Sequence, residues 1–179
     1  GRSEDLLPFV GPSKVVDTSR YFVILVDAIG NGVSTSPSNS RKQPLSKFPE
    51  FSIRDMVESQ HRLLTEVLHM SHLRAVVGVS MGGMQAFEWA ATYPDLMDLV
   101  VSMAGSLQST SFDKLLWTAQ IDAIELDPAW NHGNPTGPMD RGIALLEEID
   151  SMNLSSPAYR VAQTNPNAFE EFLAGVRKS

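Results

Sequence analysis

The chain has 179 residues, 42% of them hydrophobic, and a formal net charge of −7. This length suits a single domain with a packed core, and the hydrophobic content argues against disorder. The acidic balance argues against nucleic acid or an anionic membrane surface as a partner. The sequence contains no cysteine, which excludes a disulfide framework, a thiol nucleophile and a cysteine-ligated zinc site.

The sequence carries no recognisable targeting signal. No signal peptide and no apolar stretch of membrane-spanning length is found, so we expect a cytoplasmic protein that does not bind membranes. The chain begins with Gly1 rather than methionine, and a helical pattern at 168–173 runs on toward Ser179. We therefore expect a portion of a longer protein.

No metal-ligand spacing or phosphate-binding loop is present, so we expect neither a metal nor a bound cofactor.

The first part of the chain predicts alternating strands and helices after a loop at 1–20. An uninterrupted β-favouring run at 21–26 is typical of a buried parallel strand, and residues 27–49, rich in Gly, Ser, Asn and Pro, predict a long loop. Ser52 is predicted to cap a helix running to about residue 68, and Asp55, three residues on, makes the pattern close to that of a capping box. Strands at 74–79 and 98–103 enclose a helix at 84–93. We expect three parallel strands with right-handed crossovers.

The pattern changes after residue 104. Helices are predicted at 110–126, 139–152 and 167–177, with a Pro/Gly-rich loop at 127–138 and no further strand. A run of helices after a parallel sheet predicts a lid or cap over the carboxyl edge of the strands. We therefore expect a partial core at 1–107 and a truncated helical cap at 108–179.

A Gly-x-Ser-x-Gly pentapeptide spans Gly78 to Gly82, with Ser80 at its centre. It lies between a predicted strand and a predicted helix, which is the context of a nucleophile elbow; without that context the pattern is weak enough to arise by chance. We expect Gly78 and Gly82 to leave room where a Cβ would strike a neighbouring element. The free N–H groups of the helix that follows would face an anion formed at Ser80.

Longer stretches around the elbow resemble one family. The segments 77–90, 53–57 and 93–95 are similar to homoserine O-acetyltransferases, and 127–130 with 141–145 resembles their cap. The resemblance runs from about residue 15 to about residue 157, and its most specific stretch is Ser-Met-Gly-Gly-Met-Gln at 80–85. It implies an α/β fold of the three-layer α/β-hydrolase type, a parallel sheet flanked by helices with a helical cap insertion, incomplete in this chain.

The resemblance also implies acyl transfer through an ester on Ser80. The backbone N–H of Met81 would be one of two oxyanion donors, and Gly78, Gly82 and Gly83 would shape the elbow. The substrate would be a small-molecule ester, thioester or acyl acceptor, with acetyl-CoA as a possible co-substrate.

Two departures from the family bear on the substrate. The family's Thr-Tyr-Arg-Ser-Pro motif, whose arginine is thought to hold the homoserine carboxylate, aligns with residues 153–157 and puts Ser155 at the arginine position. A serine cannot replace a bidentate clamp, and Arg160 is the candidate to reach back to that position. The loop at 30–37 also differs from the family's glycine-rich loop. Both an ester or thioester hydrolase and an O-acetyltransferase stay open.

The partners of Ser80 are not evident in the sequence. In this fold the order is Ser, then Asp or Glu, then His, whereas His61, His69 and His72 precede Ser80 and His132 lies in the predicted cap loop; we interpret all four as solvated surface residues. No aspartate after Ser80 follows a strand as the acid should. The chain alone is thus expected to be catalytically incomplete, with the rest of the sheet supplied by another segment or a homodimer. The alternative is a non-catalytic binding or assembly module.

Overall fold

The computed structural model describes residues 2–177. They form two compact units, one reaching Leu107 and the other starting at Gln108. The division falls where the sequence changes from alternating strands and helices to helices alone.

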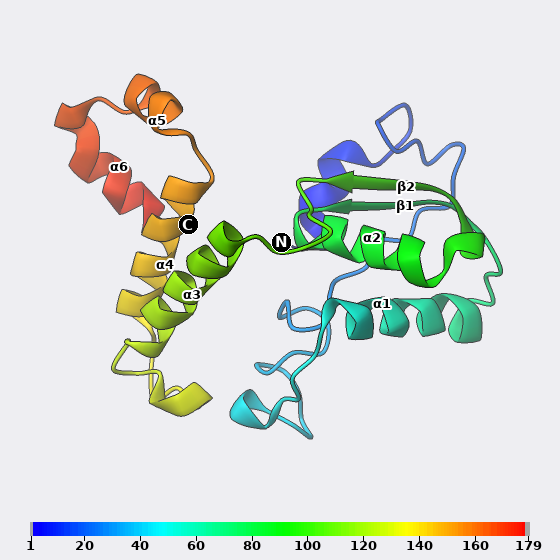
Figure 1. Ribbon diagram of the computed structural model, residues 1–179, viewed down its shortest axis with the longest axis horizontal. Helices are drawn as coiled ribbons and strands as arrows, with labels where there is room; N and C mark the ends of the chain where they lie inside the picture. The colour runs from blue at the N-terminus through cyan, green and yellow to red at the C-terminus, as the bar shows by residue number, and fades with distance from the viewer. Residues whose placement is uncertain (1, 178–179) are drawn as a thin grey trace. The chain divides into compact units, whose positions relative to one another are not determined.

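The first unit is built on two parallel strands, β1 (Leu73–Val79) and β2 (Met97–Met103). They pair in register from Leu73 opposite Met97 to Val79 opposite Met103. Helix α2 (Met81–Thr92) connects them and packs on both strands, and a 3-10 turn at Pro94–Leu96 leads into β2. Figure 1 shows α2 against the strands and α1 beyond it.

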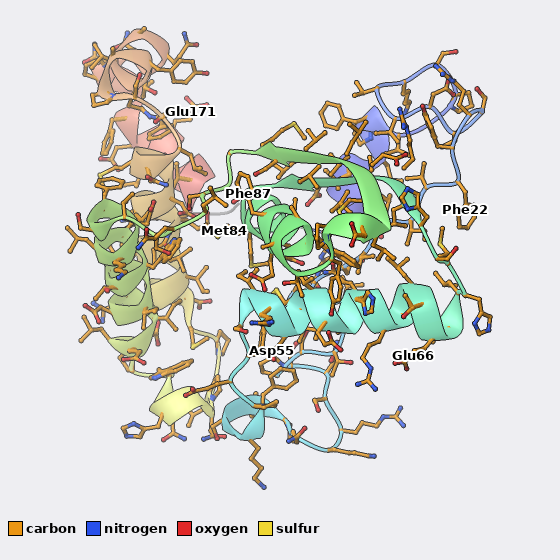
Figure 2. The ribbon with its side chains drawn as sticks, turned by 45° about the vertical axis from the view of Figure 1, so that its right-hand side comes forward. Phe22, Asp55, Glu66, Met84, Phe87 and Glu171 are labelled. Atoms are coloured by element: carbon orange, nitrogen blue, oxygen red, sulfur yellow. The ribbon has the colours of Figure 1, made fainter. Side chains whose placement is uncertain are left out.

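Helix α1 (Ile53–Arg62) begins as the sequence predicts. The Ser52 hydroxyl accepts a hydrogen bond from the Asp55 N–H, and the Asp55 carboxylate accepts one from the Ser52 N–H at 2.7 Å. These bonds confirm the capping box. The helix widens into a π-helical turn at Leu63–Val67, and Figure 2 shows Asp55 at the start of this helical segment and Glu66 near its end.

The core of this unit lies between α1, α2 and the sheet. Four buried side chains form its centre, and partly buried apolar residues, Ile24 and Val76 among them, pack against it; the four are Val57, Leu64, Trp89 and Met97. Burial of these side chains fixes α2 on one face of the sheet.

The opposite face of the sheet is apolar and exposed. Alternate residues along both strands point to it, since side chains alternate between faces. Five of them are 43–50% exposed: Val77, Val79, Leu99, Val101 and Met103.

The prediction of a strand at 21–26 is wrong, because over residues 2–177 the sheet has two strands rather than three. A strand requires a neighbour to receive its backbone hydrogen bonds, and none of the described residues pairs with this segment. Ile24 packs against the core, whereas Phe22 is 83% exposed and stands at the outside of the unit (Figure 2). The apolar run thus identifies a partly buried segment, not a hydrogen-bonded strand.

The predicted loops contain short 3-10 helices at Ser3–Phe9 and Leu45–Lys47. The rest of the loop at 27–49 is held by side-chain hydrogen bonds. Ser36 is 1% exposed, and its hydroxyl accepts from the Gly32 N–H at 2.8 Å and donates to the Ser34 carbonyl at 2.7 Å. The polar composition of this loop serves its own backbone.

The second unit contains helices only, within the residues that the structure describes. They are α3 (Ser111–Glu125), α4 (Asp140–Asn153), α5 (Pro157–Gln163) and α6 (Phe169–Val176), with 3-10 turns at Asn131–Gly133 and Pro166–Ala168. Three were predicted. Helix α5 was not predicted, although Ser156 caps it and Pro157 occupies its first turn.

Asp127 joins the two long helices of this unit. Its side chain accepts hydrogen bonds from the Ala129 and Gly142 N–H groups, both at 2.8 Å, and Gly142 packs against the Ala123 carbonyl of α3. Hydrogen bonds from Ala129 and Gly142 lower the pKa of Asp127 below its ordinary value.

Over residues 2–177, none of the helices combines the length and the apolar character needed to cross a bilayer.

Candidate active site

Ser80 occupies a sharp turn between the end of β1 and the start of α2. Its backbone has φ 55° and ψ −121°, a conformation that few residues with a side chain adopt. The Ser80 N–H donates to the Met103 carbonyl of β2 at 2.8 Å, and the Ser80 carbonyl accepts from the Gly83 N–H at 2.8 Å. The strained residue is therefore fixed on both sides by backbone hydrogen bonds.

Two of the glycines make this turn possible. A Cβ on Gly78 would lie 1.9 Å from the Gly82 carbonyl oxygen, and one on Gly83 would lie 2.7 Å from Ser102 Oγ and 3.0 Å from Gly105 Cα. The expectation that Gly82 is needed for space is wrong within the described chain, because a Cβ there would meet nothing within 4 Å. Gly82 contributes its carbonyl to the crowding around Gly78, and Gly83 makes the close approach to β2.

The turn leaves the Ser80 hydroxyl and the Met81 N–H without hydrogen-bond partners among residues 2–177. The Ser80 side chain is exposed and makes no capping hydrogen bond to α2. Among the described residues, no backbone carbonyl accepts the Met81 N–H, which is one of the orphan donors of a helix start. An oxygen that becomes negative beside Ser80 would meet this donor and the positive end of the helix dipole.

A histidine–aspartate pair exists in the first unit but lies at the wrong end of the sheet. His72 Nε2 is 2.9 Å from Asp98 Oδ1, and Arg74 donates to Asp98 Oδ2 at 2.9 Å. These bonds, that of His72 first, lower the pKa of Asp98. His72 precedes β1 and Ser80 follows it, so eight residues of extended chain place them roughly 25 Å apart. This pair cannot serve Ser80.

The prediction that all four histidines are solvated surface residues agrees with the structure for some of them and not for others. His72 is half exposed but paired with Asp98, and His61 is half-buried, stacked on Tyr93 with ring centroids 3.9 Å apart. His69 ends its helix in a left-handed conformation, and His132 belongs to the helical unit. Among residues 2–177, none of these imidazoles hydrogen-bonds to Ser80.

Arg160 reaches back to the Ser155 position. Its Nη2 donates to Ser155 Oγ at 3.1 Å and to Ser151 Oγ at 3.2 Å, and its guanidinium carbon lies 4.3 Å from the centre of the Phe172 ring. Within the described chain, Nε and Nη1 have no hydrogen-bond partner. The guanidinium is held by neutral groups, and its part in substrate binding stays a prediction.

Three residues next to the elbow were not singled out as site residues by the sequence: Gln85, Ser102 and Gly105. Ser102 Oγ donates to the Gly83 carbonyl at 3.1 Å, and Gly105 packs on Gly83 after Ala104, which has φ 51°. Gln85 is 7% exposed in the first turns of α2. The burial of Gln85 and the contacts of Ser102 and Gly105 with Gly83 arise from tertiary packing, and no local pattern indicates them.

Comparison with known proteins defines the class. Residues 9–135 match the family model described as alpha/beta hydrolase fold, and the chain belongs to this family. The fold agrees with that of an acetyl esterase, MekB, with a TM-score of 0.91 and 30% identity over 99% of this chain and 54% of that one.

Curated relatives carry two kinds of name. Homoserine O-acetyltransferase of Moorella thermoacetica is 35% identical over 83% of this chain and 41% of its own length. Ethyl acetate hydrolase of Pseudomonas veronii is 39% identical over 70% of this chain and 36% of its own length. The chain thus spans less than half the length of these relatives.

Proposed function

We propose that the protein containing this chain is an enzyme that transfers acyl groups through an ester on Ser80. The observation that carries the proposal is the strained, exposed Ser80 between β1 and α2, which makes no capping bond and lies beside a Met81 N–H that no described carbonyl accepts. Strained backbone positions that the surrounding bonds hold in place cluster at functional sites. The names of the relatives support the same reaction class, since both describe acyl transfer.

The proposed chemistry has two steps. Ser80 Oγ attacks the carbonyl carbon of an ester or thioester, and its proton passes to a base that the described residues do not supply. The carbonyl oxygen becomes an oxyanion that the Met81 N–H stabilises, and the alcohol or thiol leaves with a proton. Water or an acceptor hydroxyl then attacks the acyl-Ser80 ester and gives its proton to the same base, which passes a proton to the departing Ser80 oxygen. An oxyanion donor of this kind contributes about 10²–10³ in rate.

The acyl donor and acceptor distinguish a hydrolase from a transferase. An O-acetyltransferase would use acetyl-CoA as donor and homoserine as acceptor, whereas a hydrolase would use water. Arg160 is the proposed contact for a substrate carboxylate, because its guanidinium lies at the Ser155 position with Nε and Nη1 unengaged by described residues. Consumption of acetyl-CoA with and without homoserine, in the complete gene product, separates the two activities.

A fluorophosphonate probe tests the nucleophile. We expect covalent labelling at Ser80 in the complete gene product, located by peptide mass spectrometry and abolished by Ser80→Ala. Ser106→Ala, a serine for which no hydrogen bond is found within residues 2–177, is the matched control and should leave the labelling unchanged. A folded protein that is not labelled at Ser80 would refute the proposal.

The expected activity of residues 1–179 alone differs from that of the complete gene product. Because the described residues place no base beside Ser80, we expect residues 1–179 by themselves to show little labelling and little or no turnover. The absence of a base beside Ser80 among the described residues also keeps open the second candidate, a non-catalytic binding or assembly module. Labelling of the complete gene product excludes the module, and its absence favours it.

A further inference from the structure

Gln85 is a buried polar residue in the stretch that most resembles the acetyltransferases, and it has no role in the acyl transfer proposed for Ser80. It is 7% exposed. A buried carboxamide destabilises the fold unless its donors and acceptor are paired. Gln85 Oε1 accepts a hydrogen bond from Gln60 Nε2 at 2.6 Å, and Gln85 Nε2 lies 3.5 Å from the Met81 carbonyl oxygen. The side chain thus connects α1 to the first turn of α2.

The direction of this chain of hydrogen bonds is set at both ends. Trp89 Nε1 can only donate, and it donates to Gln60 Oε1 at 3.0 Å. The Gln60 amide nitrogen must therefore face Gln85 and donate to it, and the Gln85 carboxamide oxygen accepts this hydrogen bond. The Gln85 nitrogen is left to face the Met81 carbonyl, which can only accept. The order Trp89 to Gln60 to Gln85 to Met81 is the one orientation of the two amides in which each of these three contacts joins a donor to an acceptor.

Ser102 acts on the same turn from the sheet. It pairs with Gly78 in the register of β1 and β2, and its hydroxyl donates to the Gly83 carbonyl at 3.1 Å. The close approach of Gly83 to Ser102 and Gly105 leaves no room for a Cβ between them. The first turn of α2 is contacted at two carbonyls: the Gln85 amide, which is bonded to Gln60 of α1, lies 3.5 Å from the Met81 carbonyl, and Ser102 of β2 donates to the Gly83 carbonyl.

We propose that Gln85 and Ser102 are positioning residues for the reaction at Ser80, because they hold the first turn of α2 from two sides and so direct the Ser80 hydroxyl and the Met81 N–H. This inference rests on the proposed function. Both reactive groups belong to the peptide units at the start of this turn, so a tilt of the turn moves them together. Misplacement of reacting groups by about 1 Å lowers rates by roughly 10².

The test is the rate of acylation of Ser80 by a fluorophosphonate in the complete gene product, with Gln85→Met and Ser102→Ala. The labelling amplitude counts folded molecules, whereas the maximal rate constant at saturating probe reports geometry. We expect each substitution to lower that rate constant by about tenfold while the amplitude and the half-saturating probe concentration stay unchanged.

Two further variants sharpen the test. Gln60→Glu has nearly the same shape and keeps an acceptor for Trp89, but it cannot donate to Gln85; it should lower the rate constant as Gln85→Met does. Ser59→Ala is the control, because Ser59 Oγ donates to the Met56 carbonyl of α1 at 2.7 Å, the same kind of bond away from the elbow. Its rate constant should equal that of the unmodified protein.

The outcomes separate this inference from the proposed function. If the unmodified protein is labelled at Ser80 and both Gln85→Met and Ser102→Ala keep its rate constant, the positioning role is wrong while the nucleophile stands. The same holds if these variants lose only amplitude or melting temperature, since that is the signature of a purely structural role. If the unmodified protein is not labelled at Ser80, both proposals fail.

Discussion

Gly78 and Gly82 approach each other so closely that a Cβ on Gly78 would lie 1.9 Å from the Gly82 carbonyl oxygen. The obstacle is backbone of the same pentapeptide, so no side-chain rotation can relieve it. The requirement for glycine at 78 is therefore built into the turn that presents Ser80 and does not depend on the rest of the fold.

The two glycines of the pentapeptide should respond differently to alanine. Gly78→Ala must displace the first turn of α2, whereas a methyl group on Gly82 meets no described atom within 4 Å. We expect Gly78→Ala to lower the free energy of unfolding by about 3 kcal/mol, the upper range for overpacking, and to abolish fluorophosphonate labelling. Gly82→Ala should retain labelling. Urea unfolding and labelling of both variants in the complete gene product measure this, and equal behaviour of the two would contradict it.

Gly142 allows α3 and α4 to pack closely. A Cβ there would lie 2.9 Å from the Ala123 carbonyl oxygen and 3.0 Å from Asp127 Cβ, whereas a Cβ on Gly137 would meet nothing within 4 Å in the described chain. We expect Gly142→Ala to destabilise the helical unit by about 1–3 kcal/mol and Gly137→Ala to leave it unchanged. Protection of α3 and α4 amides from hydrogen exchange reports the effect locally. Equal protection in the two variants would argue against close packing at Gly142.

Asp127 should make the helical unit sensitive to acid. Because the Ala129 and Gly142 N–H groups lower its folded pKa, its contribution to stability is complete above the ordinary aspartate pKa of about 4 and is lost as the pH falls through the lower folded value. Asp127→Asn replaces one acceptor oxygen by a donor and should lower the urea midpoint at pH 7. The difference between the variant and the unmodified protein should shrink by pH 3. A difference that does not change between these pH values would contradict the assignment.

The exposed apolar face of the sheet should cause the isolated chain to self-associate. Val77, Leu99 and Val101 are 49%, 50% and 43% exposed on one side of β1 and β2, and contiguous apolar surface of this kind promotes association. We expect residues 1–179 to bind the dye ANS and to self-associate in sedimentation velocity experiments. Val101→Lys should reduce both, and the complete gene product should show neither. A dye-free monomer of the isolated chain with native circular dichroism would refute this.

Local chemistry accounts for what could be predicted beforehand. The capping box at Ser52, the strands that end at Val79 and Met103 and the turn at Ser80 depend on neighbours within a few residues, and a sequence pattern can indicate such features. The helix at 157–163 was missed although its signals, Ser156 and Pro157, are equally local.

The remaining features depend on residues that are distant in the chain. The segment at 21–26 has the composition of a strand, but pairing requires a partner that no local pattern can guarantee. The hydrogen bond between Gln60 and Gln85 and that between Ser102 and Gly83 join positions 25 and 19 residues apart. Spacing along the sequence gives no sign of them.

By itself the amino-acid sequence determined where the turn at Ser80 lies and that a strand and a helix flank it, because steric and hydrogen-bonding rules for a tight turn act over a few residues. Only the tertiary structure decided that Gly83 rather than Gly82 faces β2, that His72 and Asp98 lie at the far end of the sheet from Ser80, and that an amide chain from Trp89 reaches Met81. These relations follow from the packing of α1 and the sheet around α2, which brings together groups that the chain keeps apart.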